Sequence, residues 1–141
     1  MSAARPLGPV TADELLARFI TDKDWIRADQ TLRQDAFIPP KDLQLSVTRH
    51  LNLPEEQLWS IGAMVVVELA EKKAAALHGR ADLSVERVLR RHLRAVAAPL
   101  PKNPNHAHVT GWPADKSARK NIAQELAAEA GKLVPAPKAP A

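Results

Sequence analysis

The sequence predicts an α+β domain in which a small sheet of three or four short strands packs on a central buried helix. Residues 43–48 alternate between apolar and polar side chains, as in a half-buried strand. Residues 54–78 are apolar on nearly all sides of a helical wheel, which is typical of a helix at the centre of a domain. An alanine-rich helix over 115–130, stopped by Gly131, completes the predicted fold.

The remaining elements are predicted from caps and turn residues. Thr11 and Glu14 form a capping-box pattern, which predicts a short helix over 12–20. Residues 31–38 are expected to form a strand that pairs with 43–48 across the prolines between them. Gly79 is expected to end the central helix, and a second amphipathic helix is expected over 84–96.

Composition places all of this in one domain. Residues 1–10 and 133–141 are rich in proline and lack an apolar period, so we expect two disordered ends around a single α+β domain at 11–132. The chain has no cysteine, which excludes disulfides, thiolate metal sites and cysteine nucleophiles. No apolar run has the length of a signal peptide or a membrane span, so the expected location is the cytoplasm.

The basic character is confined to one region. The net charge is +4, but residues 72–94 alone hold seven Lys and Arg against two acids, a local charge of +5. Such a region can meet nucleic acid or an acidic protein. On a helix over 84–96, four arginines fall on one side, at positions i, i+3, i+4 and i+7: Arg87, Arg90, Arg91 and Arg94.

Two interpretations of this arginine stripe stay open. Guanidinium groups bind phosphate or carboxylate in a bidentate fork, so the stripe is a candidate contact surface for a partner. The alternative is an ordinary solvated face, neutralised by acids of the same chain.

A second candidate is the segment 103–113, NPNHAHVTGWP, which is dense in polar and turn residues. If its centre is extended, His106, His108 and Thr110 project on one face. Two imidazoles can shuttle a proton or hold a phosphate. No third ligand follows at metal-site spacing, so neither a metal nor a cofactor is expected. The alternative is a loop whose Asn105 and His side chains bond their own backbone while Trp112 fills the core.

Two arginines are open to a double interpretation as well. Arg49 follows Leu45 and Val47 on the same face of the predicted strand, so a cation ends a buried row. It is either held by a carboxylate or it is a pocket arginine that faces His106. Arg18, next to Phe19, allows the same two interpretations.

The segments AFIPP, LSVTR, HGRADLS and NPNHAHVTGWPADK together resemble a family of small uncharacterised bacterial proteins sharing AFxPP, LSVxR and NHAxxxGWP motifs. The similarity extends from about Arg18 to Ala130. It implies bacterial origin and one compact domain, and it implies no reaction. It places Arg49, Asn105, His106 and Trp112 in shared motifs. It also implies, as an alternative to the helix over 84–96, a strand at 93–97 after a shorter arginine helix, and both alternatives stay open.

Two functions follow from these candidates. The first is a non-catalytic binding or accessory protein that contacts another protein or a nucleic acid through Arg87, Arg90, Arg91 and Arg94 and through Asn105 and Trp112. The second is a small enzyme acting on a phosphate-containing substrate such as RNA or a nucleotide, with His106 and His108 as acid/base groups and Arg49 as anion anchor. No complete catalytic set is visible in the sequence, which favours the first.

Overall fold

The computed structural model describes residues 7–71 and 75–137. Within them, six strands form one antiparallel sheet in the order β4-β5-β2-β1-β3-β6. The strands are β1 (Leu15–Ile20), β2 (Leu45–Arg49), β3 (Gly79–Ser84), β4 (Arg94–Ala97), β5 (His106–Thr110) and β6 (Val134–Pro135). The helices are α1 (Glu55–Ala70), α2 (Val85–Leu89) and α3 (Lys116–Ala130), with 3-10 turns η1 (Lys23–Trp25) and η2 (Gln34–Phe37).

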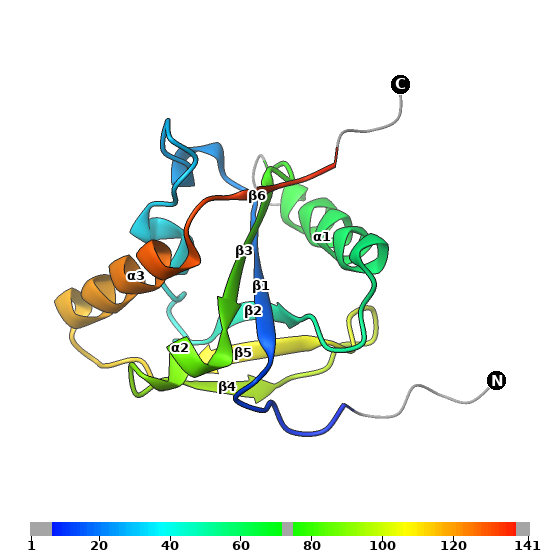
Figure 1. Cartoon of the computed structure of the whole chain (residues 1–141). Coiled ribbons are helices and arrows are strands. Elements are labelled where there is room, and N and C mark those ends of the chain that lie inside the picture. Colours follow the sequence, from blue (N-terminus) through cyan, green and yellow to red (C-terminus); the bar gives the residue numbers. More distant parts are fainter. Residues whose placement is uncertain (1–6, 72–74, 138–141) are drawn as a thin grey trace.

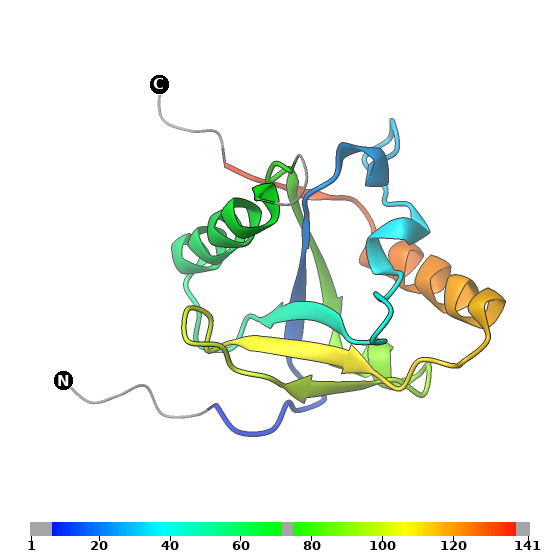
Figure 2. The same cartoon turned by 180° about the vertical axis from the view of Figure 1, so that it is seen from behind.

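The sheet separates two unequal layers, with α1 on one side and α3 with η2 on the other (Figures 1 and 2). The main core lies on the α3 side, where Leu16, Val47 and Val109 of the sheet pack with Phe37 of η2 and Leu126 of α3. On the α1 side the buried cluster consists of Ala17, Phe19 and Leu58 only. A Cβ at position 62 would lie 2.8 Å from the Phe19 ring, so glycine lets α1 approach β1 closely.

Strand β1 pairs along its full length with β3 but only briefly with β2. Leu16 is opposite Arg49 and Ala17 is opposite Thr48, and beyond this point the two strands separate. In Figure 1, β1 and β3 consequently run across the direction of β2, β5 and β4. Among the described residues, α1 covers β1, while the same side of β2, β5 and β4 is left without a helix (Figure 2).

The α+β class agrees with the sequence prediction, but the predicted architecture was wrong. The sheet has six strands rather than three or four. It does not pack on a central buried helix either, because α1 lies on the surface of one side and has only Leu58 and Gly62 fully buried. The sheet is larger because four strands were not predicted: β1, β4 and β6 lie in segments that were assigned to helices or to the tail, and β3 lies in the connection expected between two helices.

The capping-box pattern misled the prediction of a helix over 12–20. The Thr11 backbone N–H does donate to Glu14 Oε2 at 2.7 Å, but the capped unit is a single turn. Residues 15–20 then form β1, which has buried side chains on both faces and therefore no period of two. The strand predicted over 31–38 is also wrong, because the 3-10 turn η2 occupies its second half, and no hairpin joins it to β2.

The two predicted middle helices are shorter than expected. Helix α1 ends at Ala70, and Gly79 begins β3 instead of capping a helix; residues 72–74 lie outside the described part. The helix predicted over 84–96 is α2, which ends at Leu89, after which the chain turns through His92 at φ 60° and forms β4. A strand at this position agrees with what the family resemblance implied.

The C-terminal helix is confirmed as α3, with the Asp115 carboxylate accepting from the Ala118 N–H and Gly131 at its end. Beyond it, Val134 and Pro135 form β6 against β3, inside the range predicted to be a disordered tail. At the other end, the Gly8 and Pro9 carbonyls accept hydrogen bonds from Arg49, so this part of the predicted N-terminal tail is attached to the domain. Across 7–71 and 75–137, none of the helices has the length and hydropathy that a membrane crossing requires.

Candidate binding cleft

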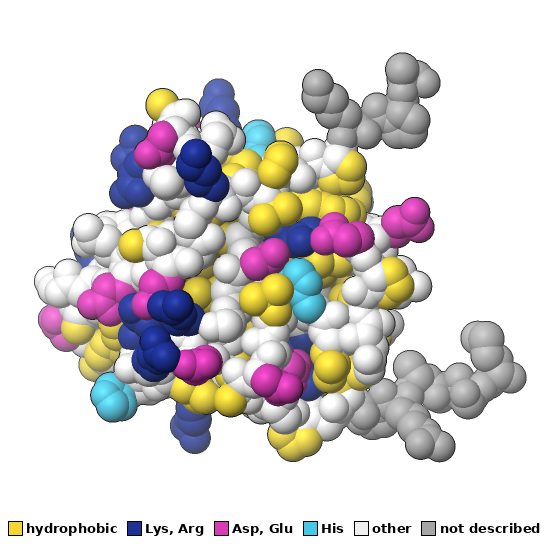
Figure 3. All heavy atoms as spheres, in the orientation of Figure 1, with side chains coloured by type: hydrophobic (Ala, Val, Ile, Leu, Met, Phe, Trp, Pro, Cys, Tyr) yellow, Lys and Arg dark blue, Asp and Glu magenta, His cyan; other side chains and the backbone are white. Residues whose placement is uncertain are grey.

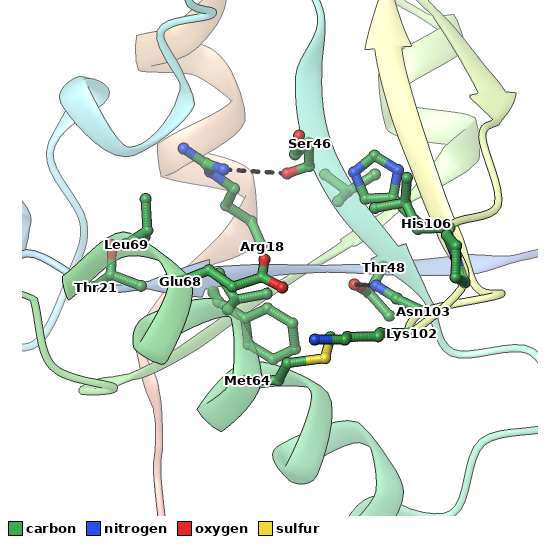
Figure 4. A pocket seen from close by; sticks show the side chains of 15 residues that line it. Arg18, Thr21, Ser46, Thr48, Met64, Glu68, Leu69, Lys102, Asn103 and His106 are labelled. Carbon is green, nitrogen blue, oxygen red and sulfur yellow. Dashed lines mark hydrogen bonds between the residues drawn. The ribbon is translucent and has the colours of Figure 1, made fainter. Parts of the chain in front are cut away.

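A pocket of about 560 Å³ lies between the second half of α1 and the part of the sheet where β1 and β2 separate (Figure 4). One wall consists of α1 side chains, including Met64, Val65 and Glu68. The opposite wall comes from the sheet, with Ser46 and Thr48 of β2 and His106 of β5. The loop 100–103 closes one end. We call this pocket the cleft.

Arg18 lies where β1 and β2 part and lines the cleft. Its Nε donates to the Ala36 carbonyl at 2.9 Å, and one terminal nitrogen donates to the Ser46 carbonyl at 3.1 Å, as Figure 4 shows. The guanidinium also lies 5.6 Å from the centre of the Trp25 ring. Burial lowers the pKa of Arg18 to about 10, so the group stays cationic at neutral pH. No carboxylate lies within 4.0 Å of it among the described residues.

His106 has one ring nitrogen fixed and one available. Nδ1 lies 2.9 Å from the Ala98 carbonyl, which only accepts, so Nδ1 carries the proton and Nε2 has the lone pair. No hydrogen bond within the described residues reaches Nε2. Burial lowers the pKa of His106; the hydrogen bond to Ala98 raises it, the nearby His108 lowers it further, and the net shift is downward. The ring is therefore neutral at pH 7.

The floor of the cleft is held by a chain of amide hydrogen bonds. Asn103 Nδ2 donates to Thr48 Oγ1 at 3.0 Å, and Asn103 Oδ1 accepts from the Asn105 N–H. Asn105 Nδ2 donates to the carbonyls of Arg49 and Leu51, at 2.8 Å each. Asn105 thus joins the end of β2 to the start of β5 and is buried, so it positions the cleft without lining it.

Outside the cleft, the α1 side of β2, β5 and β4 continues as an exposed surface. Ser46, His108 and Val96 are directly opposite one another on these strands and so share one face. The His108 ring packs edge-on against His106 with 4.7 Å between the centroids. Arg94 projects on the same face and makes no ion pair within the described residues. We call this surface the open face.

Arg49 is on the opposite side of the sheet from His106, which contradicts its prediction as an anion anchor in the same pocket. Its guanidinium forms a fork with Glu14, at 2.6 and 2.8 Å, and both side chains are almost fully buried. Burial raises the pKa of Glu14, but hydrogen bonds from Arg49 and Thr11 lower it more, and the net shift is downward. Of the two interpretations of Arg49, the structure therefore supports the one in which a carboxylate holds it in a structural ion pair.

The predicted arginine stripe does not exist as a single helix face. Arg91 binds Glu125 at 3.0 Å and Glu129 at 2.6 Å, Arg87 binds Glu129, and Arg90 binds Glu86. Figure 3 shows the basic and acidic side chains side by side over α2 and α3. Arg94 is on β4 instead. These ion pairs favour the interpretation in which the stripe is neutralised within the chain.

Trp112, predicted as a binding residue, belongs to the main core and is only 6% exposed. Its Nε1 donates to the Val109 carbonyl at 2.9 Å. Trp112 therefore fills the core, as one interpretation of 103–113 expected. The segment is not a loop that fixes its own backbone, however, because residues 106–110 form β5 and the Asn105 side chain bonds the carbonyls of Arg49 and Leu51.

One cluster was missed in the sequence. Arg80 of β3 forms a fork with Glu55 of α1, at 2.7 and 3.0 Å, binds Asp82 at 2.9 Å and lies 4.8 Å from the centre of the Trp59 ring. Asp82 also binds His50 Nε2 at 2.8 Å. The pattern Arg-x-Asp in a strand would have indicated it, but this segment was interpreted as the region after a helix. The cluster fastens the start of α1 to the sheet.

No protein-family model matches the chain, and searches among curated proteins and solved structures find no match either. Within the described residues, no group of three His, Asp or Glu side chains is arranged to hold a metal ion.

Proposed function

We propose that this chain is a non-catalytic binding or accessory protein and that its contact site is the cleft with the adjoining open face. The observation that carries the proposal is an open cleft of about 560 Å³ in which, among the described residues, Arg18 has no acidic partner and no hydrogen bond reaches His106 Nε2. Binding sites are typically concave and mostly apolar with a few convergent polar groups. Arg87, Arg90 and Arg91, in and just after α2, are paired with acids of the same chain, which makes that region the weaker candidate for contact with a protein or nucleic acid.

The experiment is a thermal-shift screen of the full chain against small molecules of all charge types. Ser46→Trp fills the mouth of the cleft from an exposed position, and Val96→Trp places the same side chain on the open face outside the cleft. We expect compounds that stabilise the wild type and Val96→Trp but leave Ser46→Trp unchanged. The proposal fails if no compound stabilises the wild type, or if Ser46→Trp keeps the response to every hit.

The alternative, a small enzyme acting on a phosphate-containing substrate, is supported by one observation. The neutral His106 lies beside His108, with 4.7 Å between the ring centroids, and such a pair can serve as acid and base; the nearby cation is Arg18 rather than Arg49. Hydrolysis of a 2′,3′-cyclic nucleotide or of bis(p-nitrophenyl) phosphate tests it. If the wild type turns over either compound and both His106→Gln and His108→Asn lose this turnover, the enzyme hypothesis replaces the binding proposal. If the wild type gives no more product than buffer alone, the enzyme hypothesis is excluded.

A further inference from the structure

We propose that the cleft binds a small organic anion, a carboxylate or phosphate group on an apolar body, with the charged group at Arg18 and the body against α1. This inference rests on the binding function proposed above and adds the chemical class of the ligand.

The unmatched charge of Arg18 is the first argument. Arg49 and Arg80, the fully buried arginines, each bind carboxylates within 3.0 Å. Within 7–71 and 75–137, the Arg18 guanidinium donates only to the neutral carbonyls of Ala36 and Ser46. Because guanidinium has five N–H donors, three of its donors make no hydrogen bond with a described residue. Residues 1–6, 72–74 and 138–141 contain no Asp or Glu side chain that would supply the missing charge.

The charges around the cleft give the second argument. Its lining contains two cations, Arg18 and Lys102, against one carboxylate, that of the exposed Glu68 on α1, so the net charge of the lining is positive. An anion that enters is therefore attracted by the lining as a whole, and it gains charge-assisted hydrogen bonds at Arg18. His106 Nε2 adds a polar atom nearby that either accepts from a ligand hydroxyl or takes up a proton and donates to the anion.

The remaining walls fit an apolar body. They include six hydrophobic side chains from β1, α1 and the loop 100–103: Phe19, Met64, Val65, Leu69, Leu100 and Pro101. Methionine adapts to ligands of different shape because it is unbranched and flexible. The volume of about 560 Å³ is that of a pocket for a drug-sized molecule, so a bare inorganic ion would leave most of the cleft unused.

The test uses four probes with the same eight-carbon chain: octanoate, octyl phosphate, octylamine and 1-octanol, each titrated calorimetrically into the full chain. We expect at least one of the two anions to bind with one site per chain, and octylamine to bind at least about tenfold more weakly, because a charge-assisted hydrogen bond is replaced by repulsion. The arms with octanoate and octyl phosphate distinguish a carboxylate ligand from a phosphate ligand.

Variants show where the anion binds, and a second set keeps the result interpretable if one variant does not fold. Arg18→Met should weaken anion binding by at least about tenfold. Because Arg18 also binds two carbonyls, its replacement can disturb the fold, and two exposed residues provide a second measurement. Glu68→Gln should tighten octanoate binding about twofold, and Lys102→Gln should weaken it by a similar factor. For octylamine we expect the opposite effects.

The inference is overturned if octylamine or octanol binds as tightly as the anions, or if Glu68→Gln and Lys102→Gln leave octanoate binding unchanged. Binding of neutral or cationic compounds that is lost in Ser46→Trp would overturn the anion inference while leaving the binding function intact. Anion binding that survives in Ser46→Trp would overturn both.

Discussion

At the scale of single residues, the Arg49–Glu14 pair determines how the domain responds to loss of a charge. Glu14→Gln removes the one carboxylate that binds the Arg49 guanidinium in the described part of the chain, and this guanidinium is 1% exposed. We expect a loss of about 3–5 kcal/mol in the free energy of unfolding, since the remaining charge is buried without a partner. Urea unfolding measures it, and Asp13→Asn, an exposed neighbouring acid, is the control. A cost below about 1 kcal/mol would mean that solvent reaches Arg49.

The same carboxylate predicts the response to acid. The pKa of Glu14 is lower in the folded chain than its ordinary 4.5. Its contribution to stability is therefore complete above about 4.5 and is lost as the pH falls through the lower, folded value. Urea unfolding as a function of pH should show a steep decline below 4.5 that is flatter in Glu14→Gln. Equal slopes for the two proteins would contradict the lowered pKa.

For His106 we expect a titration by NMR with a pKa below 6.5 and a proton on Nδ1 in the neutral ring. His108→Asn removes a neighbouring charge that lowers this value, so the pKa of His106 should rise toward 6.5. His92→Asn, in an exposed turn, should leave it unchanged. A downward shift in His108→Asn would show that the two rings do not interact as the structure has them.

At the scale of elements, the ion pairs of the arginines that follow α2 are expected to differ in strength. Arg91 is 14% exposed and binds two glutamates of α3, one of which, Glu129, has a second carboxylate oxygen that is buried without a partner. Arg91→Met should cost about 1–2 kcal/mol. Arg90→Met, in a pair that is about 60% exposed on both sides, should cost less than about 0.5 kcal/mol. Equal costs in thermal or urea unfolding would contradict this order.

The pairing of β6 with β3 requires a glycine at position 79. A Cβ at Gly79 would lie 2.3 Å from the Val134 carbonyl oxygen and 2.7 Å from Leu133. Gly79→Ala should therefore destabilise the domain by about 1–3 kcal/mol and expose the Ala136 amide, which bonds the His78 carbonyl, to hydrogen exchange. In a chain truncated after Leu133 the same substitution should cost much less. An equal cost in both chains would show that the clash is not with β6.

The elements that sequence reasoning found are those whose signals are local. The period of two in β2, the extended centre of β5, and the Asp115 cap and Gly131 stop of α3 need no distant partner to be recognised. Strand β3 was missed because its alternate residues, Arg80 and Asp82, are satisfied by α1 and His50 rather than by an apolar layer. Its partners come from far along the chain, and no local pattern shows them.

For the site too, the sequence predicted only the features that depend on local alternation. Alternation in β5 placed His106 and His108 on one face, as the structure has them. Alternation in β2 also put Arg49 in line with Leu45 and Val47, but it does not show which face of β2 His106 shares. The cleft itself arises where β1 leaves β2, and this separation is a property of the assembled sheet.

At the scale of the whole molecule, the two layers should differ in local stability. Helix α1 has two fully buried residues in sixteen, whereas β1 is central in the sheet and buried on both faces. Hydrogen exchange should therefore be faster for the α1 amides than for those of β1, by local opening rather than global unfolding. Octanoate at saturation should slow exchange in α1 and leave α3 unchanged. Equal protection of α1 and β1 in the free chain would contradict the difference between the layers.

The order of the strands has a consequence for how the chain folds. Only β1 with β2 and β4 with β5 are neighbours both in sequence and in the sheet; β2 pairs with β5, β1 with β3, and β3 with the C-terminal β6. Domains built from such distant pairings close large loops before they gain contacts, and they fold on a scale of milliseconds to seconds. Because β6 is the last of the described strands along the chain, the six-stranded sheet cannot be completed until residues 134–135 have been synthesised.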